Sequence, residues 1–385
     1  MSVMSERTRY RALVVQRRLT HYRAAFFESL RRELYKRDCE LKLVHGEPAP
    51  SERGKEDLGI LPWGKRVETR YFLGERICWQ PLGAHLAEVE IAVLSAENKL
   101  IYNLIPQYFY KSPRIALWGH GANLQADARS VRERFKRATA KRADWWFGYT
   151  EMSVPLIEQS GFPSERITVL NNAVDTLEFS NMVGSVKQET LQQLREELGL
   201  KSTKIGVYLG SLYTEKRIPF MLDAVSEIRH RHPDFEFLIV GSGPQKDLVE
   251  RFCTSHEWAK YLGVRQGQAK ANVLALASVM INPGVVGLNI LDSFVAGVPI
   301  ATTDCRGHGP EIAYLVNGKN GLMTANSLSD YVNVVSALLL DKPAMHALST
   351  DCKVSATRYS VQNMARNFAD GIMRCLELPI LRARE

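Results

Sequence analysis

The sequence predicts an α/β protein of two domains, each built on a parallel sheet, on three observations. Its 385 residues are too many for one compact core and suffice for two. Short apolar runs typical of strands alternate with segments of helical periodicity from the start of the chain. A polar, charged stretch over 180–203 interrupts this alternation, which then begins again with a strand.

The first half predicts one β/α domain over residues 1–178. A strand over 12–15, a helix over 24–34 and a strand over 41–44 form a βαβ unit, which requires parallel strands. Residues 46–87 are rich in aromatic residues and proline and show no clean period, so no element is assigned to them. The other strands expected here are 91–94, 114–118, 145–149 and 167–170, and the other helices are 100–110 and 153–160.

The second half predicts another β/α domain over 179–360, with the polar stretch as its connection and a surface helix. One helix is expected over 219–231, where Pro219 stands in the tolerant first turn. Another is expected over 288–296, closed by Gly297. The strands expected here are 204–209, 236–240, 261–263, 279–281 and 298–301, and the last helix of the chain is 361–377.

The stretch 282–304 carries the strongest functional signal. A proline and two glycines, Gly284 and Gly287, keep its first residues out of regular structure until the helix begins. A loop that opens a helix leaves backbone N–H groups facing an anion, usually a phosphate. Asp292 stands about one turn inside the helix, where it could accept hydrogen bonds from a ribose. The sequence therefore predicts a phosphate-binding loop here.

The layout of this stretch resembles the nucleotide-sugar signature of retaining GT-B glycosyltransferases of glycosyltransferase family 4. That signature reads Glu, seven residues, Glu, then small-x-Ala-x-Gly-x-Pro. Gly297 and Pro299 fix the register, so that Asp292 replaces the second Glu and Gly284 the first. The resemblance implies a GT-B fold, in which two Rossmann-like domains face each other across a cleft and the C-terminal helix, about 361–385, rejoins the first domain.

Other donor contacts follow from the same resemblance. Lys216 matches the family's diphosphate-binding lysine, which would stabilise the leaving group. The family usually has arginine at Ser211, and we predict that Arg217 compensates. The second glycine loop, Gly241-Ser-Gly243, lacks the third glycine of G-x-G-x-x-G, so we exclude a dinucleotide and assign it to the base or ribose. The full set of expected donor contacts is Gly210, Ser211, Arg217, Gly241, Gly243, Asp292 and the backbone N–H groups of Val286, Gly287 and Leu288.

Two features of the first domain predict substrate contacts. His120 directly follows a strand and is flanked by glycines, so it projects from the sheet edge where open α/β sheets bind ligands. The resemblance gives it a catalytic place beside the donor sugar; a structural histidine is the alternative. The loop after the first strand carries Arg18, His21 and Tyr22, which we predict to bind the acceptor, with a solvated turn as the alternative.

Charge and composition limit the possible binding partners and the cellular compartment of the protein. The chain has a net charge of +8, and its densest basic stretch, 129–142, has the periodicity of a basic amphipathic helix. This helix could be a solvated face or could attract anionic lipid headgroups or a pyrophosphate-linked acceptor. Among the possible partners of this basic helix, nucleic acid is the least favoured, because no nucleic-acid-binding motif accompanies the basic residues. Six scattered cysteines and the lack of a long apolar run or signal peptide predict a cytoplasmic protein, with peripheral contact at the inner face of the plasma membrane as an option.

The function that the resemblance implies is retaining transfer of a sugar from a nucleotide diphosphate sugar, UDP or GDP, to a saccharide or lipid-linked saccharide, in cell-surface polysaccharide synthesis. No cofactor is expected, and the absence of an Asp-x-Asp motif predicts metal independence. One alternative is a non-catalytic or degenerate nucleotide-sugar-binding subunit. It is favoured by Gly284 and Ser211, which replace a glutamate and an arginine of the family. The other is a nucleotide-sugar epimerase on the same fold, which the lack of carboxylates near His120 disfavours.

Overall fold

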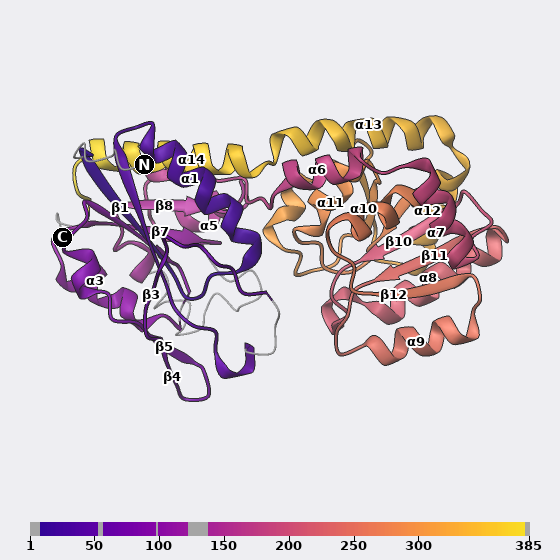
Figure 1. Ribbon diagram of the computed structural model, residues 1–385, viewed down its shortest axis with the longest axis horizontal. Helices are drawn as coiled ribbons and strands as arrows, with labels where there is room; N and C mark the ends of the chain where they lie inside the picture. Colours follow the sequence, from indigo (N-terminus) through magenta and orange to yellow (C-terminus); the bar gives the residue numbers. More distant parts are fainter. Residues whose placement is uncertain (1–7, 53–56, 98, 122–137, 382–385) are drawn as a thin grey trace. The chain divides into compact units, whose positions relative to one another are not determined.

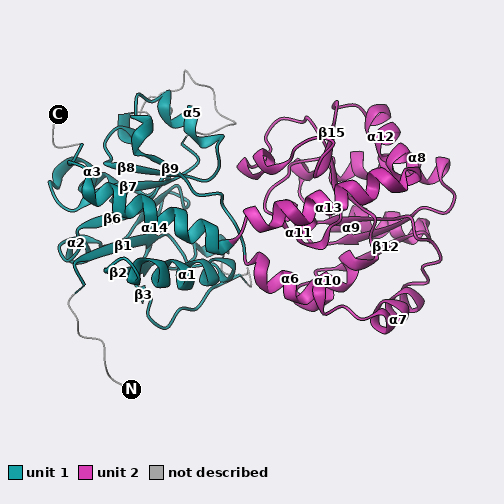
Figure 2. Cartoon of the chain, turned by 90° about the horizontal axis from the view of Figure 1, so that it is seen from above, with its two compact units in different colours: residues 1–174, 361–385 teal, residues 175–360 magenta. Residues whose placement is uncertain are grey.

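The computed structural model has two compact units, each with its own parallel sheet, and confirms the predicted α/β fold class. Unit 1 comprises residues 1–174 and 361–385, and unit 2 comprises 175–360 (Figure 2). The residues that the structure describes are 8–52, 57–97, 99–121 and 138–381.

Unit 1 is built on a seven-stranded sheet in which every neighbouring pair of strands is parallel (Figure 1). Its strands are β1 (Tyr10–Gln16), β2 (Cys39–His45), β3 (Lys65–Arg66), β6 (Ile91–Ser95), β7 (Arg114–Gly119), β8 (Trp145–Gly148) and β9 (Ile167–Val169). They lie in the order β3-β2-β1-β6-β7-β8-β9. The order reverses between β1 and β6, and such a switch point is where open α/β sheets bind ligands, outside the carboxyl ends of the strands.

The C-terminal helix belongs to unit 1. Helix α14 (Val361–Glu377) packs on α1 (Ala24–Tyr35) and on the sheet. Phe368 of α14 stacks on Phe147 of β8, with ring centroids 4.2 Å apart, and lies 5.6 Å from Phe26 of α1. This buried aromatic contact fastens the end of the chain to the first unit. The shorter helices of unit 1 are α2 (Gly83–Leu86), α3 (Leu104–Phe109) and α5 (Ser153–Glu158).

Part of the segment left unassigned in the sequence forms an antiparallel hairpin, which projects from unit 1 in Figure 1. Its strands, β4 (Arg70–Phe72) and β5 (Ile77–Trp79), have three residues each. Strands this short cannot display a period of two, which explains why the pattern gave no signal.

Unit 2 is built on a six-stranded parallel sheet in the order β12-β11-β10-β13-β14-β15. Its strands are β10 (Ile205–Leu209), β11 (Glu236–Val240), β12 (Ala259–Gly263), β13 (Val279–Ile281), β14 (Ile300–Thr303) and β15 (Gly321–Thr324). Strands β10 and β11 are buried along their whole length, as expected for a sheet covered on both faces. The switch point of this sheet lies between β10 and β13.

The polar stretch that we expected to connect the domains forms two helices of unit 2. Asp175 caps the first of them by accepting a hydrogen bond from the N–H of Glu178, at 2.9 Å. The second has no buried residue and is the expected surface helix. The helices of unit 2 are α6 (Thr176–Gly184), α7 (Gln188–Leu198), α8 (Ile218–Arg231), α9 (Lys246–Ser255), α10 (Gly267–Leu276), α11 (Asn289–Ala296), α12 (Leu328–Leu340) and α13 (Lys342–Arg358).

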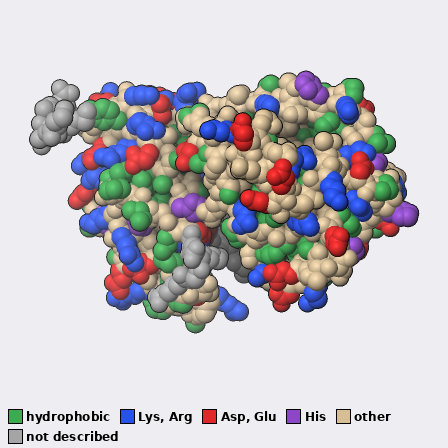
Figure 3. Space-filling view, turned by 45° about the vertical axis from the view of Figure 1, so that its right-hand side comes forward, with side chains coloured by type: hydrophobic (Ala, Val, Ile, Leu, Met, Phe, Trp, Pro, Cys, Tyr) green, Lys and Arg blue, Asp and Glu red, His purple; other side chains and the backbone are tan. Residues whose placement is uncertain are grey.

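Basic and acidic side chains are interspersed over the face shown in Figure 3. The basic stretch 129–142 lies mostly outside the described residues, so its predicted helix stays a prediction. No helix in the described part of the chain combines the length and apolar character needed to cross a bilayer.

Candidate active site

Lys216 lies at the switch point of unit 2, in a short 3-10 turn (Thr214–Lys216) that follows β10. Its ammonium donates a hydrogen bond to the carbonyl oxygen of Val285, at 2.5 Å, in the loop that follows β13. The residue is only 6% exposed. Burial lowers the pKa of Lys216 to about 8, although the charges of Cys305 and Glu311 oppose that shift. A buried cation therefore lies where the turn after β10 meets the glycine loop after β13.

Gly284 is glycine because its backbone touches the backbone of the Lys216 turn. A Cβ at this position would lie 2.4 Å from both the carbonyl carbon and the carbonyl oxygen of Lys216. It would also lie 2.7 Å from the carbonyl oxygen of Glu215, which accepts a 3.0 Å hydrogen bond from the N–H of Val285. No side chain fits there without moving one loop. The glutamate of the family signature is thus replaced by a backbone-to-backbone contact.

Two of the three amides predicted to bind donor hydroxyls have partners within the chain. The N–H of Val286 donates to Nδ1 of His308, at 3.0 Å, and the N–H of Gly287 donates to Oδ1 of Asn289, at 3.1 Å. Asn289 in turn donates from Nδ2 to the carbonyl oxygen of Leu209, at 3.1 Å, and so ties the loop to the end of β10. A ligand that uses either amide has to share or replace these bonds.

Asp292 also has a partner. Its Oδ1 accepts a 2.6 Å hydrogen bond from Nζ of Lys270 on α10, and both side chains are largely buried. The ammonium of Lys270 lies 4.1 Å from the ring centroid of Phe179. A carboxylate has about four acceptor sites, so the pair with Lys270 does not exhaust Asp292. The lysine instead holds the carboxylate in place.

Arg217, predicted to reach the diphosphate, is bound to three groups beside Lys216. It donates to Oδ1 of Asn326 at 2.6 Å, to Oγ1 of Thr303 at 3.1 Å and to the carbonyl oxygen of Pro283 at 3.2 Å. Its guanidinium lies 4.1 Å from the ring centroid of Phe220. In this conformation Arg217 fixes the start of the glycine loop.

The glycines of the other two loops serve close packing. A Cβ on Gly241 would lie 1.8 Å from the carbonyl oxygen of Gly210, so the loops after β10 and β11 touch through their backbones. The loops are also joined by the N–H of Leu212, which donates to the carbonyl oxygen of Ser242 at 2.9 Å. Ser211 between them is exposed. Gly243 is explained by the same contact, because its Cβ would lie 2.6 Å from the carbonyl oxygen of Leu212.

His308 was missed in the sequence, although it stands between two glycines after β14. Because its Nδ1 accepts from the Val286 N–H, the proton sits on Nε2, which lies 2.9 Å from the carbonyl oxygen of Thr303. The N–H of Gly309 donates to the carbonyl oxygen of Val286, at 2.8 Å. Burial raises the pKa of the Cys305 thiol, but hydrogen bonds to His308, 3.5 Å away, and to Thr303, together with the positive charge of Arg217, outweigh burial and lower the pKa overall. His308 and Gly309 thus hold the glycine loop at Val286.

In unit 1, His120 follows β7 at the carboxyl edge of the sheet and is exposed. Its ring lies 4.4 Å from the ring of Tyr149, measured between centroids. His21 and Tyr22 are also exposed, just before α1, with their rings 6.0 Å apart in an edge-to-face arrangement. Loops after β1, β7 and β8 therefore bring these aromatic and imidazole side chains to one edge of unit 1.

Arg18 lies in the loop after β1, where its side chain is paired within unit 1. Its guanidinium forms a two-point ion pair with Asp57, at 2.7 and 2.8 Å, and is largely buried. The hydrogen bond to Asp57 raises the pKa of Arg18 despite partial burial. Its charge is thus compensated within the chain. Sequence spacing could not show this pairing, because Asp57 lies in a loop that the pattern did not assign.

Arg23 is another cation at the end of this loop. It is 7% exposed, and its guanidinium lies 5.2 Å from the ring centroid of Tyr22 and 5.1 Å from that of Trp118. Its hydrogen bond to the sulfur of Met364 is long, at 3.8 Å, and it forms no ion pair with any described residue. It stands at the N-cap of α1, whose first turn contains no acidic residue. Both features favour an anion there.

The described residues contain no group of three or more His, Cys, Asp or Glu side chains placed to hold a metal ion.

Comparison with known proteins gives a family match within unit 2 and a likeness in fold over nearly the whole chain. Residues 203–341 match the family "Glycosyl transferases group 1". The fold is similar to that of HepE of Anabaena in complex with UDP, with a TM-score of 0.70 at 15% identity over 94% of this chain and 100% of that one. It is also similar to a glycosyltransferase of Rickettsia africae, with a TM-score of 0.68 at 14% identity over 96% and 99%. These likenesses confirm the GT-B fold.

Curated relatives match about half of the chain. The chain is 23% identical over 190 residues to alpha-monoglucosyldiacylglycerol synthase of Acholeplasma laidlawii, covering 48% of this chain and 47% of that one. It is 25% identical over 194 residues to GDP-mannose-dependent alpha-(1-6)-phosphatidylinositol monomannoside mannosyltransferase of Mycolicibacterium smegmatis, covering 47% and 49%. The chain thus spans about half the length of the curated relatives it matches. Its fold is that of the GT-B glycosyltransferases, and residues 203–341 of unit 2 match the group 1 family.

Proposed function

We propose that this protein transfers a sugar from a nucleotide diphosphate sugar to a saccharide or lipid-linked saccharide, with retention of anomeric configuration and without a metal, as in family 4. The single observation that carries the proposal is the buried ammonium of Lys216 at the switch point of unit 2, inside the matched domain. A cation held out of water beside a helix-opening loop is suited to a diphosphate leaving group.

On the donor side, Lys216 exchanges the Val285 carbonyl for a phosphate oxygen, while Asp292, held by Lys270, accepts from the ribose. The bond between the anomeric carbon and the diphosphate oxygen breaks as the acceptor oxygen attacks from the same face. The acceptor proton passes to the departing diphosphate oxygen, so no protein nucleophile is consumed. His120 takes the place beside the donor sugar that the family resemblance implies.

On the acceptor side, we assign His21, Tyr22 and Arg23 to the acceptor. Arg18 is left out because Asp57 already compensates its charge. The printed names of two relatives concern diacylglycerol and phosphatidylinositol glycolipids, which supports a lipid-linked acceptor and work at the cytoplasmic face of a membrane. UDP and GDP remain the nucleotides to test, since HepE binds UDP and the mycobacterial relative depends on GDP-mannose.

The test is turnover of UDP-, GDP- and ADP-sugars with saccharide and lipid-linked acceptors, by wild type, Lys216→Met and Lys319→Met. Lys319 is an exposed lysine of unit 2 and serves as the matched control. We expect product from one nucleotide family, unchanged by EDTA, lost in Lys216→Met and kept in Lys319→Met. Nuclear magnetic resonance of the product should show the anomeric configuration of the donor. An inverted product, or activity that EDTA abolishes, would contradict the mechanism.

A second function, a nucleotide-sugar-binding subunit without catalysis, is favoured by one observation. At Gly284 the backbone contact with Lys216 leaves no room for the carboxylate of the family signature. Such a subunit would bind a nucleotide through Lys216 and turn over no donor. Nucleotide binding without product from any donor and acceptor pair would select this function over transfer.

A further inference from the structure

Arg217, which directly follows Lys216, has a backbone conformation that arginine rarely adopts. Its φ and ψ are +56° and +46°, in the left-handed region, and it stands at the N-cap of α8. A Cβ in this region crowds the neighbouring backbone, so glycine is the residue that most easily takes such a position. Another residue persists there only where its surroundings fix the conformation. The reason for an arginine at this position therefore has to come from its side chain.

The guanidinium of Arg217 connects the carboxyl ends of three neighbouring strands. Its Nη1 donates to the carbonyl oxygen of Pro283 after β13, to Oγ1 of Thr303 at the end of β14 and to Oδ1 of Asn326 after β15. The guanidinium also lies 4.1 Å from the ring centroid of Phe220 on α8. Because β13, β14 and β15 are adjacent in the sheet, one planar side chain fastens the edge from which the glycine loop starts.

The first peptides of the glycine loop are held by other side chains as well. The hydroxyl of Thr303, which is completely buried, donates to the carbonyl oxygen of Pro283 at 2.7 Å. The carbonyl oxygen of Gly284 accepts from Nδ2 of Asn282 at 3.3 Å. Of these three donors, Arg217 alone belongs to the turn after β10. It therefore sets the distance between that turn and the loop.

Donor binding removes one of the links between this turn and the loop. In the proposed function, Lys216 exchanges the carbonyl oxygen of Val285 for a phosphate oxygen. The links that remain include the 3.0 Å bond from the N–H of Val285 to the carbonyl oxygen of Glu215 and the 3.2 Å bond from Arg217 to Pro283. The bond from Arg217 thus keeps the loop in place while Lys216 is engaged with the donor.

We propose that Arg217 is a positioning residue for the donor. It holds the glycine loop at the distance from Lys216 at which the ammonium and the loop meet the same diphosphate, and it acts through the loop. The inference rests on the proposed function for this consequence, because only a donor uses the loop. It also explains why arginine occupies a conformation that favours glycine.

The test combines hydrogen exchange of the amides of 284–288, read by mass spectrometry, with calorimetric titration of UDP and GDP. Arg217→Met loses the hydrogen bonds and keeps the left-handed strain, whereas Arg217→Gly loses both. We expect faster exchange and a ~tenfold higher nucleotide Kd in both variants, because both lose the bonds of a charged donor. Arg217→Gly should nevertheless unfold at a higher urea concentration than Arg217→Met, because glycine adopts this conformation without strain.

Asn326→Ala separates positioning from direct contact with phosphate. The change removes the 2.6 Å partner of Arg217 and leaves the guanidinium in the protein. Asn326 is exposed, so the fold should be kept. A positioning residue loses part of its hold, so we expect faster exchange over 284–288 and ~threefold weaker nucleotide binding. A guanidinium that binds phosphate itself would be released by the change, and binding would be equal or tighter.

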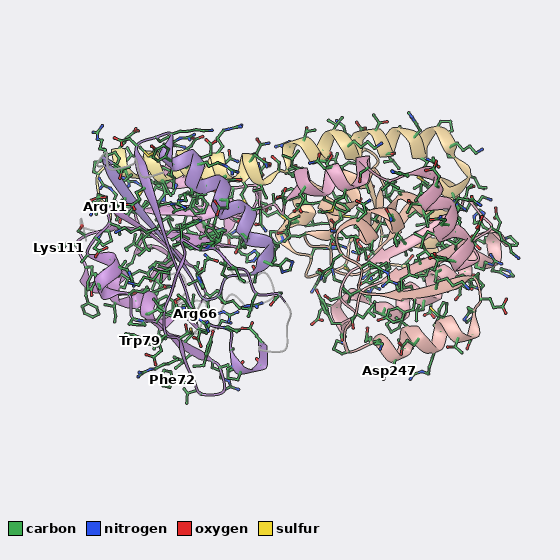
Figure 4. All side chains as sticks on the ribbon, in the orientation of Figure 1. Arg11, Arg66, Phe72, Trp79, Lys111 and Asp247 are labelled. Atoms are coloured by element: carbon green, nitrogen blue, oxygen red, sulfur yellow. The ribbon has the colours of Figure 1, made fainter. Side chains whose placement is uncertain are left out.

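The matched control is Arg251→Met, on α9. Arg251 is exposed and stands one helical turn after Asp247, which Figure 4 labels at the outer edge of unit 2. We expect exchange over 284–288 and nucleotide Kd in this variant to equal those of wild type.

Unchanged exchange in either Arg217 variant, or equal or tighter binding in Asn326→Ala, would overturn the proposal. So would a nucleotide Kd that follows the urea midpoint from variant to variant, because Arg217 would then act only through stability. A wild type that binds no nucleotide would count against the proposed function, and hydrogen exchange would still decide whether Arg217 holds the loop.

Discussion

Replacing Gly284 by alanine tests whether the two loops at the donor site are in backbone contact. The added methyl would lie 2.4 Å from the carbonyl carbon and oxygen of Lys216, too close for any real contact. Overpacking of a tight site costs about 1–3 kcal/mol. Separation of the loops would also break the hydrogen bond from Val285 N–H to the Glu215 carbonyl, which contributes about 1 kcal/mol. We expect the unfolding free energy of unit 2 to fall by about 2–4 kcal/mol.

The assay is urea unfolding followed by circular dichroism, with Gly287→Ala as the control. Gly287 is in the same loop, and an added Cβ there has no atom within 4 Å. We therefore expect its stability to stay within ~0.5 kcal/mol of wild type. Restoring the family signature with Gly284→Glu should lower transferase activity, because a longer side chain displaces Lys216. If Gly284→Ala is as stable as Gly287→Ala, the close contact is absent and the explanation of the missing glutamate fails.

Three further predictions concern charges and hydrogen bonds at the two sites. Because burial lowers the pKa of Lys216 to about 8, donor affinity measured by calorimetry should fall as the pH rises through 8, where the ammonium loses its proton. Between about pH 8 and the ordinary lysine pKa, the unfolded chain still holds the proton that the folded chain has lost, so the stability of unit 2 should increase as the pH rises over that window. Lys216→Met should abolish both effects. A stability and an affinity that do not change with pH in wild type would refute the burial of Lys216. His308→Ala removes the bond that fixes the glycine loop at Val286, so the loop becomes less ordered and KM for the donor should rise ~tenfold with little change for the acceptor; an equal change in both would argue for general unfolding. Arg23→Met should raise KM for an anionic acceptor and leave KM for the donor unchanged, and the reverse split would remove Arg23 from the acceptor site.

The regular part of the fold could be predicted because parallel β/α units leave a strong local pattern. The strands β10, β11 and β13 are short apolar runs, and α11 has both a helical stripe and a glycine stop. Each of these patterns can be recognised from residues that are close together in the sequence. The same is true of the glycine loop and of Lys216, whose places follow from their positions after strands.

What could not be predicted depends on pairs that are distant in sequence. Nothing near Asp292 indicates that Lys270 binds it, and nothing near Arg18 indicates Asp57. From the sequence, Gly284 is only the position where the family's glutamate is missing. The structure shows why glycine is required there, because its backbone contacts the backbone of Lys216. These outcomes are decided by which loops meet, and that information appears only once the sheets are assembled.

The central claim is that Lys216 holds the diphosphate of a nucleotide donor, and calorimetric titration of UDP and GDP tests it most directly. Wild type, Lys216→Met and the exposed-lysine control Lys319→Met would be titrated with and without Mg²⁺. We expect wild type and Lys319→Met to bind one nucleotide with the same Kd in both buffers, and Lys216→Met to bind it at least tenfold more weakly, since a charged hydrogen bond to phosphate contributes about 1.5–3 kcal/mol. Equal binding by Lys216→Met, or no binding of any nucleotide by wild type, would contradict the account.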